Sequence, residues 1–307
     1  MSQTFALAIH GGAGTIRRSD LTPEIEQATH AGLLRALEAG SAILRDGGSA
    51  LDAVTAAVCA LEDEPLFNAG RGAVFTSAGR QEMDAAVMNG ADRRAGAVAG
   101  LFGPRNPIRA ARAVMEGSPH VMMIGEAAAR IAQEAGLPFE EASYFFTQKR
   151  WDALQETLAL RARGETSSDA AVRHGTVGAV ACDLNGNLAA ATSTGGMTGK
   201  APGRVGDTPV IGAGTLADDI CAVSGTGHGE VFIRYGAAAE IAARMRHLGE
   251  SLDAAADHVV HRVLAPNDGS GGLVAVDRHG NVALPFNSEG MYRGYVRSGK
   301  APVTAIY

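Results

Sequence analysis

The stretch HGTVGAVACDLNGNLAAATST at residues 174–194 contains two short apolar runs separated by the polar sequence DLNGN at 183–187. Apolar runs of this length, bounded by turn residues, are typical of buried strands. The stretch therefore predicts a β-hairpin with strands at 176–182 and 188–194.

The length of the loop decides which residues of this hairpin face one another. A three-residue loop at 184–186, with a left-handed Gly186 as its last residue, places Thr176 opposite Thr194. Opposed Cβ atoms lie about 4.5–5.5 Å apart, so two hydroxyls would meet at the open end of the hairpin. A two-residue loop would instead place Gly195 opposite Thr176. A facing pair of threonines can also serve only to stabilise the sheet.

The same pattern recurs near the C-terminus as LVAVDRHGNVAL at 273–284, which predicts a second hairpin. Strands near both ends, with helices grouped between them, favour a layered α+β fold. Further strands are expected at 5–9, 73–75, 84–88 and 95–101, and helices at 23–45, 50–61, 107–116, 125–135, 148–162, 229–247 and 250–264.

Composition excludes several classes of protein. The net charge of −6 and the lack of a lysine or arginine run argue against nucleic acid as a partner. The three cysteines are scattered, which fits a reducing compartment better than a disulfide framework. We find neither a signal peptide nor an apolar segment long enough to span a membrane, and expect a cytoplasmic protein. The 40 glycines come in clusters, as expected where backbone turns sharply or approaches a ligand closely.

Thr176 follows the dipeptide His174-Gly175 and a polar stretch, about 161–173, that predicts an exposed linker. A threonine hydroxyl is a weak nucleophile unless a base lies beside it, and the residue's own freed α-amino group can be that base. The pKa of such an amine, about 7.7–8.0, suits this task near neutral pH. Cleavage between Gly175 and Thr176 would release it. Glycine at 175 fits a tightly turned scissile bond.

Many motifs, in order, resemble the plant-type asparaginase and isoaspartyl peptidase family, whose members are N-terminal-nucleophile hydrolases of the threonine type. The resemblance covers about 290 residues and is carried by AIHGGAG at 8–14, LFNAGRGAVF at 66–75, MDAAVM at 83–88, HGTVGAV at 174–180, TSTGGMTGK at 192–200, GRVGD at 203–207, GTGHGE at 225–230 and ALPFNSEGMYRG at 283–294.

The resemblance implies a four-layer αββα sandwich that forms one globular domain over 1–307. It also implies self-cleavage into an α chain, 1–175, and a β chain, 176–307, with two αβ units forming a dimer. The implied reaction is hydrolysis of β-aspartyl amide bonds in isoaspartyl dipeptides and L-asparagine. It needs no cofactor for catalysis, and neither nucleic acid nor a membrane is an expected partner.

The resemblance also implies roles for individual residues. Thr176 matches the nucleophile, and Thr194 and Asn68 match polar groups beside it. Thr226 and Gly227 match an oxyanion hole. Arg204 matches the group that holds the substrate α-carboxylate, as guanidinium–carboxylate pairing would require, and Asp207 matches the partner of the α-ammonium. The remaining matched substrate-binding positions are Val205, Gly206, His228 and Gly229. A structural sodium ion would be held by the backbone carbonyls of Leu61, Glu62, Glu64, Phe67, Ala69 and Arg71.

The sequence is also compatible with other functions. His228 departs from the family, in which threonine or aspartate is common at this position, and we expect its side chain to point outward. Glycosylasparaginases carry aspartate before the nucleophile, so Gly175 favours the isoaspartyl branch. A threonine-type endopeptidase is a further alternative, and a binding or scaffold protein that keeps the fold without turnover is the non-enzymatic one.

Overall fold

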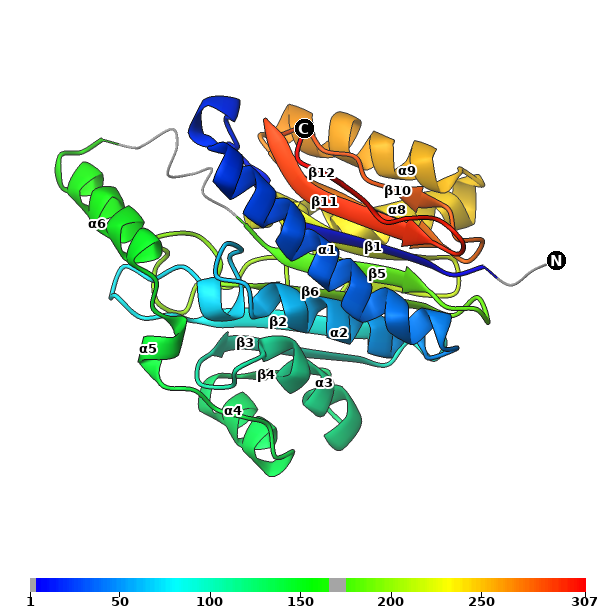
Figure 1. The fold of residues 1–307 in the computed structure, drawn as a ribbon, viewed down its shortest axis with the longest axis horizontal. Coiled ribbons are helices and arrows are strands. Elements are labelled where there is room, and N and C mark those ends of the chain that lie inside the picture. The colour runs from blue at the N-terminus through cyan, green and yellow to red at the C-terminus, as the bar shows by residue number, and fades with distance from the viewer. Residues whose placement is uncertain (1–3, 166–174) are drawn as a thin grey trace.

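The computed structural model describes residues 4–165 and 175–307, and it contains both helices and sheets (Figure 1). Residues 166–174 lie outside the described residues; they comprise most of the linker expected at about 161–173 and also His174. The strands are β1 Ala6–Gly14, β2 Met83–Asn89, β3 Ala95–Leu101, β4 Met122–Ile124, β5 Val177–Cys182, β6 Leu188–Thr194, β7 Thr215–Ala217, β8 Cys221–Gly227, β9 Gly271–Asp277, β10 Val282–Ala283, β11 Gly290–Arg297 and β12 Val303–Ala305.

The helices begin close to the predicted positions in the first half of the chain. Thr22 and Ser49 cap the first two, because their side-chain oxygens accept hydrogen bonds from backbone N–H groups three residues on. The helices are α1 Pro23–Arg45, α2 Ala50–Glu62, α3 Pro107–Gly117, α4 Gly125–Glu134, α5 Ala142–Phe145, α6 Gln148–Ala162, α7 Gly229–Tyr235, α8 Ala237–Ala243 and α9 Leu252–His258.

The strands form two sheets. The larger has eight strands in the order β12-β11-β1-β5-β6-β2-β3-β4, and the smaller has four in the order β10-β9-β8-β7. All neighbouring strands are antiparallel except β3 and β4. Strands β5 and β6, the predicted first hairpin, therefore lie at the centre of the larger sheet, between β1 and β2.

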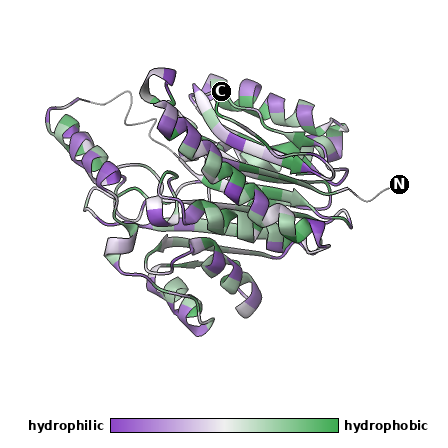
Figure 2. Cartoon of the chain, in the orientation of Figure 1, coloured by the Kyte–Doolittle hydropathy of each residue, from purple (hydrophilic) through white to green (hydrophobic). Residues whose placement is uncertain are grey.

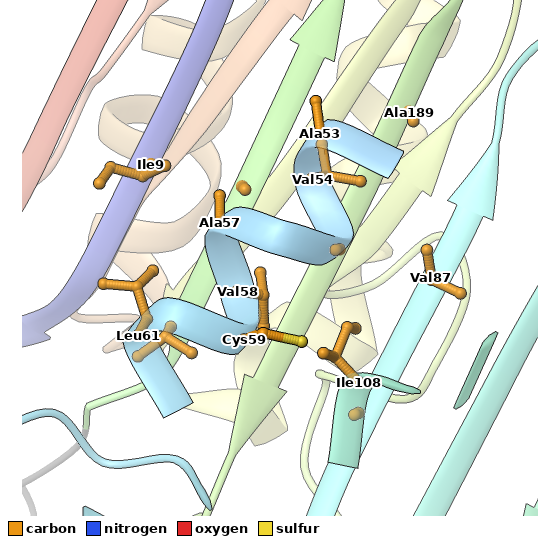
Figure 3. Close-up of a cluster of buried hydrophobic side chains, with 14 of the residues drawn as sticks. Ile9, Ala53, Val54, Ala57, Val58, Cys59, Leu61, Val87, Ile108 and Ala189 are labelled. Atoms are coloured by element: carbon orange, nitrogen blue, oxygen red, sulfur yellow. The ribbon is translucent and has the colours of Figure 1, made fainter. Parts of the chain in front are cut away.

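Helices α1 and α2 cover one face of the larger sheet (Figure 1). The strands beneath α2 carry alanine at Ala179 and Ala189, so the helix approaches closely, and its Val54, Val58 and Leu61 fill the space between (Figure 3). Hydrophilic and hydrophobic residues alternate along the covering helices (Figure 2), as expected for helices with one buried face.

The opposite face of the larger sheet packs against the smaller sheet. Val180 and Ala190 of the larger sheet meet Ala222, Val274 and Val276 of the smaller one in a second apolar cluster. A third cluster buries α8 and α9 against β8 and β9. None of the helices among the described residues is both long and apolar enough to cross a bilayer.

Two sequence predictions of secondary structure were wrong. Residues 73–75 do not form a strand; they follow a 3-10 turn at Gly70–Gly72, and only Thr76 makes an isolated bridge, to Lys200. The predicted helix 229–247 breaks at Gly236, which is left-handed with φ 53° and separates α7 from α8. The predicted helix 250–264 is present, as α9 and a π-helical turn, Val259–Leu264, that continues it.

Candidate active site

The hairpin of β5 and β6 has the register predicted from a three-residue loop. Val177 pairs with Ser193, and the N–H of Asp183 donates to the carbonyl of Asn187 at 2.9 Å. Gly186 closes the loop in the left-handed region, with φ 80°. The threonine pair therefore forms at the open end of the hairpin.

The two threonines are buried and hydrogen-bonded to each other. Thr176 Oγ1 donates to Thr194 Oγ1 at 3.1 Å. Thr194 Oγ1 also accepts from the N–H of Gly196 at 2.9 Å, and its own hydroxyl hydrogen is directed to the carbonyl oxygen of Gly175 at 3.1 Å. One arrangement of hydrogens satisfies all three contacts, with Thr194 accepting from Thr176 and donating to Gly175.

Asn68 supplies a second donor to the same carbonyl. Its Nδ2 lies 2.7 Å from the carbonyl oxygen of Gly175 and 2.7 Å from that of Gly196, while its Oδ1 accepts from the N–H of Val74 at 2.9 Å. The amide is buried, and these bonds fix its orientation. The carbonyl of the Gly175–Thr176 bond thus has a hydroxyl and an amide donor on its oxygen, and a second hydroxyl beside it.

His10, on β1, contacts this centre, although the sequence reasoning gave it no role. Its Nδ1 lies 2.8 Å from the Thr176 carbonyl oxygen, and its Nε2 lies 2.9 Å from Ser224 Oγ. Complete burial lowers the pKa of His10 to about 4, so the ring is neutral at pH 7. A neutral ring whose Nδ1 faces a carbonyl carries its proton there, and Nε2 then accepts from Ser224. The buried hydroxyls of Thr192 and Thr215 continue the chain at 2.8 and 2.7 Å.

Arg204 and Asp207 lie on the loop that follows β6. Both nitrogens on one edge of the Arg204 guanidinium, Nε and Nη2, donate to the carboxylate of Glu230 at 3.0 and 2.9 Å. Glu230 is at the start of α7, and the sequence reasoning did not assign it. Because this pairing uses the Nε edge, the end formed by Nη1 and Nη2 remains the face from which a ligand carboxylate can approach.

Asp207 is enclosed by backbone. A Cβ added at Gly214 would lie 2.6 Å from its Oδ2, and one added at Gly229 would lie 2.8 Å from its Oδ1, so both positions must be glycine. Oδ2 has no hydrogen-bond partner among the described residues. Burial raises the pKa of Asp207 to about 7. A buried carboxylate with an unused oxygen is suited to accept a cationic group from a ligand.

Thr226 and Gly227 lie at the end of β8. Thr226 is buried, and its Oγ1 accepts from the N–H of Ala13 at 3.1 Å, which leaves its hydroxyl hydrogen for another acceptor. Gly227 pairs with Gly271 on β9. Within the described residues no hydrogen bond joins either residue to the Gly175 carbonyl, which Asn68 and Thr194 hold instead.

The remaining matched residues surround this loop. Val205 is exposed, and Gly206 lies against the Arg204 guanidinium. His228, which we expected to point outward, is partly exposed, but its Nδ1 lies 3.1 Å from the Asp268 carbonyl and its Nε2 lies 3.5 Å from Glu230. It therefore adjoins the carboxylate that holds Arg204.

The predicted carbonyl ligands lie at the C-terminal end of α2, which Leu61 and Glu62 form, and in the loop after it. A Cβ at Gly70 would lie 2.6 Å from the Glu62 carbonyl oxygen, and one at Gly72 would lie 2.0 Å from that of Phe67. These two oxygens therefore lie against the backbone of Gly70 and Gly72, which leaves no room for a side chain at either position. The carbonyl of Leu61 accepts from the N–H groups of Asp63 and Glu64. The carbonyls of Glu64 and Ala69 accept one backbone hydrogen bond each, which leaves each a second lone pair. Backbone oxygens are among the ligands that a hard cation takes in proteins.

Known proteins of similar sequence carry the names asparaginase or isoaspartyl peptidase. Residues 3–306 match a family model described as asparaginase. The chain is 52% identical to the isoaspartyl peptidase of Salmonella typhimurium, with 98% of each chain covered. It is 41% identical to the plant-type L-asparaginase of Pyrococcus abyssi, over 96% of this chain and 97% of that one. It is 40% identical to the human isoaspartyl peptidase/L-asparaginase, over 96% of this chain and 94% of that one. The match extends over nearly the whole length, and the chain belongs to this asparaginase family.

Proposed function

We propose that this chain is a self-processing hydrolase of β-aspartyl amide bonds, acting on isoaspartyl dipeptides and L-asparagine. The names of its relatives support the reaction class. The observation that carries the mechanism is the Gly175 carbonyl, whose oxygen accepts from Asn68 and Thr194 while the Thr176 hydroxyl lies beside it.

Self-cleavage begins with attack of Thr176 Oγ on the carbonyl carbon of Gly175. The hydroxyl proton passes to Thr194, which gives its own proton to the developing oxyanion, and Asn68 Nδ2 stabilises that oxyanion further. When this intermediate collapses, the bond between the Gly175 carbonyl carbon and the Thr176 nitrogen breaks. The nitrogen takes up the proton that Thr194 had given to the oxyanion, and the carbonyl group re-forms as an ester. Water then hydrolyses the resulting ester, leaving a carboxylate on Gly175 and a free amine on Thr176.

The freed amine acts as the general base in turnover. It takes the proton from Thr176 Oγ, which attacks the β-carbonyl carbon of the substrate. The Thr226 hydroxyl and the Gly227 N–H stabilise the oxyanion in our proposal, and the amine returns the proton to the leaving ammonia or peptide amine. A water molecule, deprotonated by the same amine, hydrolyses the β-aspartyl ester and releases aspartate.

Substrate recognition is assigned to the loop between β6 and β7. The Nη1 and Nη2 end of Arg204 holds the α-carboxylate, and the enclosed carboxylate of Asp207 accepts from the α-ammonium. Val205, Gly206, His228 and Gly229 line the same region. Two observations support this assignment. The buried Oδ2 of Asp207 lacks a partner among the described residues. Glu230 pairs with only the Nε and Nη2 edge of Arg204, so the Nη1 and Nη2 end is left for a ligand.

The wider organisation is also a proposal. Helices on the outer face of each of two packed sheets support a four-layer αββα sandwich of the N-terminal-nucleophile type, formed by one domain and cut into 1–175 and 176–307. We propose a dimer of αβ units that works in the cytoplasm, without a catalytic cofactor and without nucleic acid or membrane partners. A sodium ion held by the carbonyls of the loop after α2 would stiffen that loop, which positions Asn68.

The test is to purify Thr176→Ala beside the wild type and to assay both with a β-aspartyl dipeptide, L-asparagine and a glycosylated asparagine. We expect wild-type fragments that hydrolyse the first two substrates, and an intact, inactive variant. Turnover of the glycosylated substrate alone would favour a glycosylasparaginase, and cleavage of a protein substrate alone an endopeptidase. Fragments from Thr176→Ala would contradict the mechanism, and an intact, inactive wild type would favour a binding or scaffold protein.

A further inference from the structure

Asp84 is a buried carboxylate that the reaction above does not use. On β2 it is the register partner of Thr194 on β6, so the two side chains share one face of the sheet. The pairing of β2 with β3 is irregular between Met83 and Ala85, which makes Asp84 the displaced residue. Its Oδ1 accepts from the N–H of Gly100 at 2.9 Å. Its Oδ2 has no hydrogen-bond partner of ordinary geometry among the described residues.

Lys200 lies against the same end of β2. It is 4% exposed, and its Nζ donates to the Glu82 carbonyl at 2.7 Å. Its Nζ also lies 2.9 Å from the position that a Cβ on Gly196 would occupy. Gly196 is the residue whose N–H donates to Thr194 and whose carbonyl accepts from Asn68. Lys200 therefore supports the backbone that holds the two residues beside the scissile bond.

The loop that carries Arg204 is anchored at the same place. The N–H of Gly203 donates to the Glu82 carboxylate at 2.7 Å, directly before Arg204. Residues 196–207 are thus fixed to the start of β2 by the ammonium of Lys200 and by this backbone bond. The two sets of site residues, those around Thr176 and those that would hold the substrate, share this anchor.

The charges facing these groups are complementary. Burial raises the pKa of Asp84, while Lys200, Arg204 and the N–H groups of Gly100 and Gly206 act in the opposite direction. Burial lowers the pKa of Lys200, while Asp84 and Glu82 oppose that effect and Arg204 adds to it. Each of the two buried groups therefore lies in the field of the other, and removing one leaves the other without compensation.

We propose that Asp84 and Lys200 are buried positioning residues of opposite charge that set the loop carrying Arg204 in register with the nucleophile at Thr176. The inference rests on the proposed function. Neither residue touches the reacting atoms; both act through Gly196, Gly206 and Arg204. Loss of either side chain should therefore weaken substrate binding and slow self-cleavage together.

The test compares Lys200→Met, Asp84→Asn and the double variant with the wild type. Intact mass gives the rate of self-cleavage, and steady-state assays of a β-aspartyl dipeptide give kcat and KM. We expect Lys200→Met to raise KM and to slow cleavage by about tenfold or more, the size of a coupling between neighbouring buried groups. The double variant should recover part of both losses, because it carries no uncompensated charge.

Arg244→Met is the matched control, since Arg244 pairs with Glu250 at 2.6 Å on the outer helices. It should lower Tm while cleavage and KM stay at wild-type values. If Lys200→Met does not fold, Lys200→Arg keeps the charge in an altered geometry and should be cleaved with a raised KM. A Lys200 variant that folds with unchanged KM and cleavage would overturn the positioning role. A wild type that neither cleaves itself nor turns over substrate would overturn the proposed function, and this inference with it.

Discussion

At the scale of single residues, the site contains ionisable side chains whose charged forms are disfavoured by burial. Asp207 is the clearest example, because the glycines that bring backbone against its carboxyl also remove water from it. Its raised pKa of about 7 means that the carboxylate form, which the proposed contact with a substrate ammonium requires, is only partly populated near neutral pH in the free protein. We therefore expect the stability of the protein and its binding of substrate to respond to pH in opposite directions at this residue.

The pH dependence follows from this shift. Because the pKa of Asp207 is raised from 3.8 to about 7, its contribution to folding is most favourable below pH 4 and declines as pH rises through about 7. The kcat/KM for a β-aspartyl dipeptide should instead fall as pH decreases below about 7. Asp207→Asn should lower activity by 100-fold or more. At pH 8 it should raise the free energy of unfolding, because each unit by which folding raises the pKa of Asp207 costs the wild type about 1.4 kcal/mol at that pH. Urea unfolding at pH 5 and pH 8 checks this, and a variant less stable than the wild type at pH 8 would contradict it.

Glu230 tests how Arg204 is held. Glu230→Gln keeps one hydrogen-bond acceptor but removes the charge that fixes the Nε edge of the guanidinium. Since Arg204 then has other orientations available, KM for a β-aspartyl dipeptide should rise about three- to tenfold with kcat nearly unchanged, an effect of about 1 kcal/mol. Glu240→Gln, on the outer surface of α8, is the control. An unchanged or lower KM in Glu230→Gln would show that Glu230 does not orient Arg204.

At the scale of elements, the hairpin shows why some of the site was predictable. Its apolar runs and its turn determine the register of the two strands, and this register places Thr176 beside Thr194. Because register depends on local sequence, this contact is predictable without the rest of the fold. Asn68 and Arg204 were assigned only through the family resemblance. His10, Glu230 and Lys200 were missed, because their partners come from distant parts of the chain. Asp84 did carry a signal, as a lone charge in the apolar run MDAAVM.

The broken helices have a different cause. Residues 229–247 keep a helical apolar pattern across Gly236, so periodicity predicts one helix where a left-handed glycine divides it. The edge strands β4, β7 and β12 have only three residues each and leave too little pattern to detect. Such elements are defined by the neighbours with which they pair.

The two similar hairpins give a prediction at this scale. Gly186 and Gly280 close their loops with φ 80° and 76°, which an alanine adopts at a cost of about 1 kcal/mol. Gly186→Ala and Gly280→Ala should each lower the free energy of unfolding by about this amount, as measured by urea denaturation. Gly47→Ala, with φ 80° and no atom within 4 Å of an added Cβ, is a control for backbone strain alone. If either hairpin variant is as stable as the wild type, the turn does not constrain the hairpin.

At the scale of the whole molecule, residues from both sides of the Gly175–Thr176 bond build one site. His10 on β1 and Asn68 after α2 precede the bond, and they contact the Thr176 and Gly175 carbonyls. Strand β1 lies between β5 and β11 in the larger sheet, so cleavage would leave the two chains held by strand pairing and by the shared core. We therefore expect cleavage to leave the assembly intact, with the two fragments co-purifying under native conditions.

The most direct test of the central claim is the intact mass of the purified wild-type protein under denaturing conditions, with N-terminal sequencing of each species. The account predicts two polypeptides, one ending at Gly175 and one beginning with a free Thr176, and no fragments from Thr176→Ala. A single chain of 31.4 kDa that still hydrolyses a β-aspartyl dipeptide would contradict it, because the amine proposed as the base would then be locked in a peptide bond.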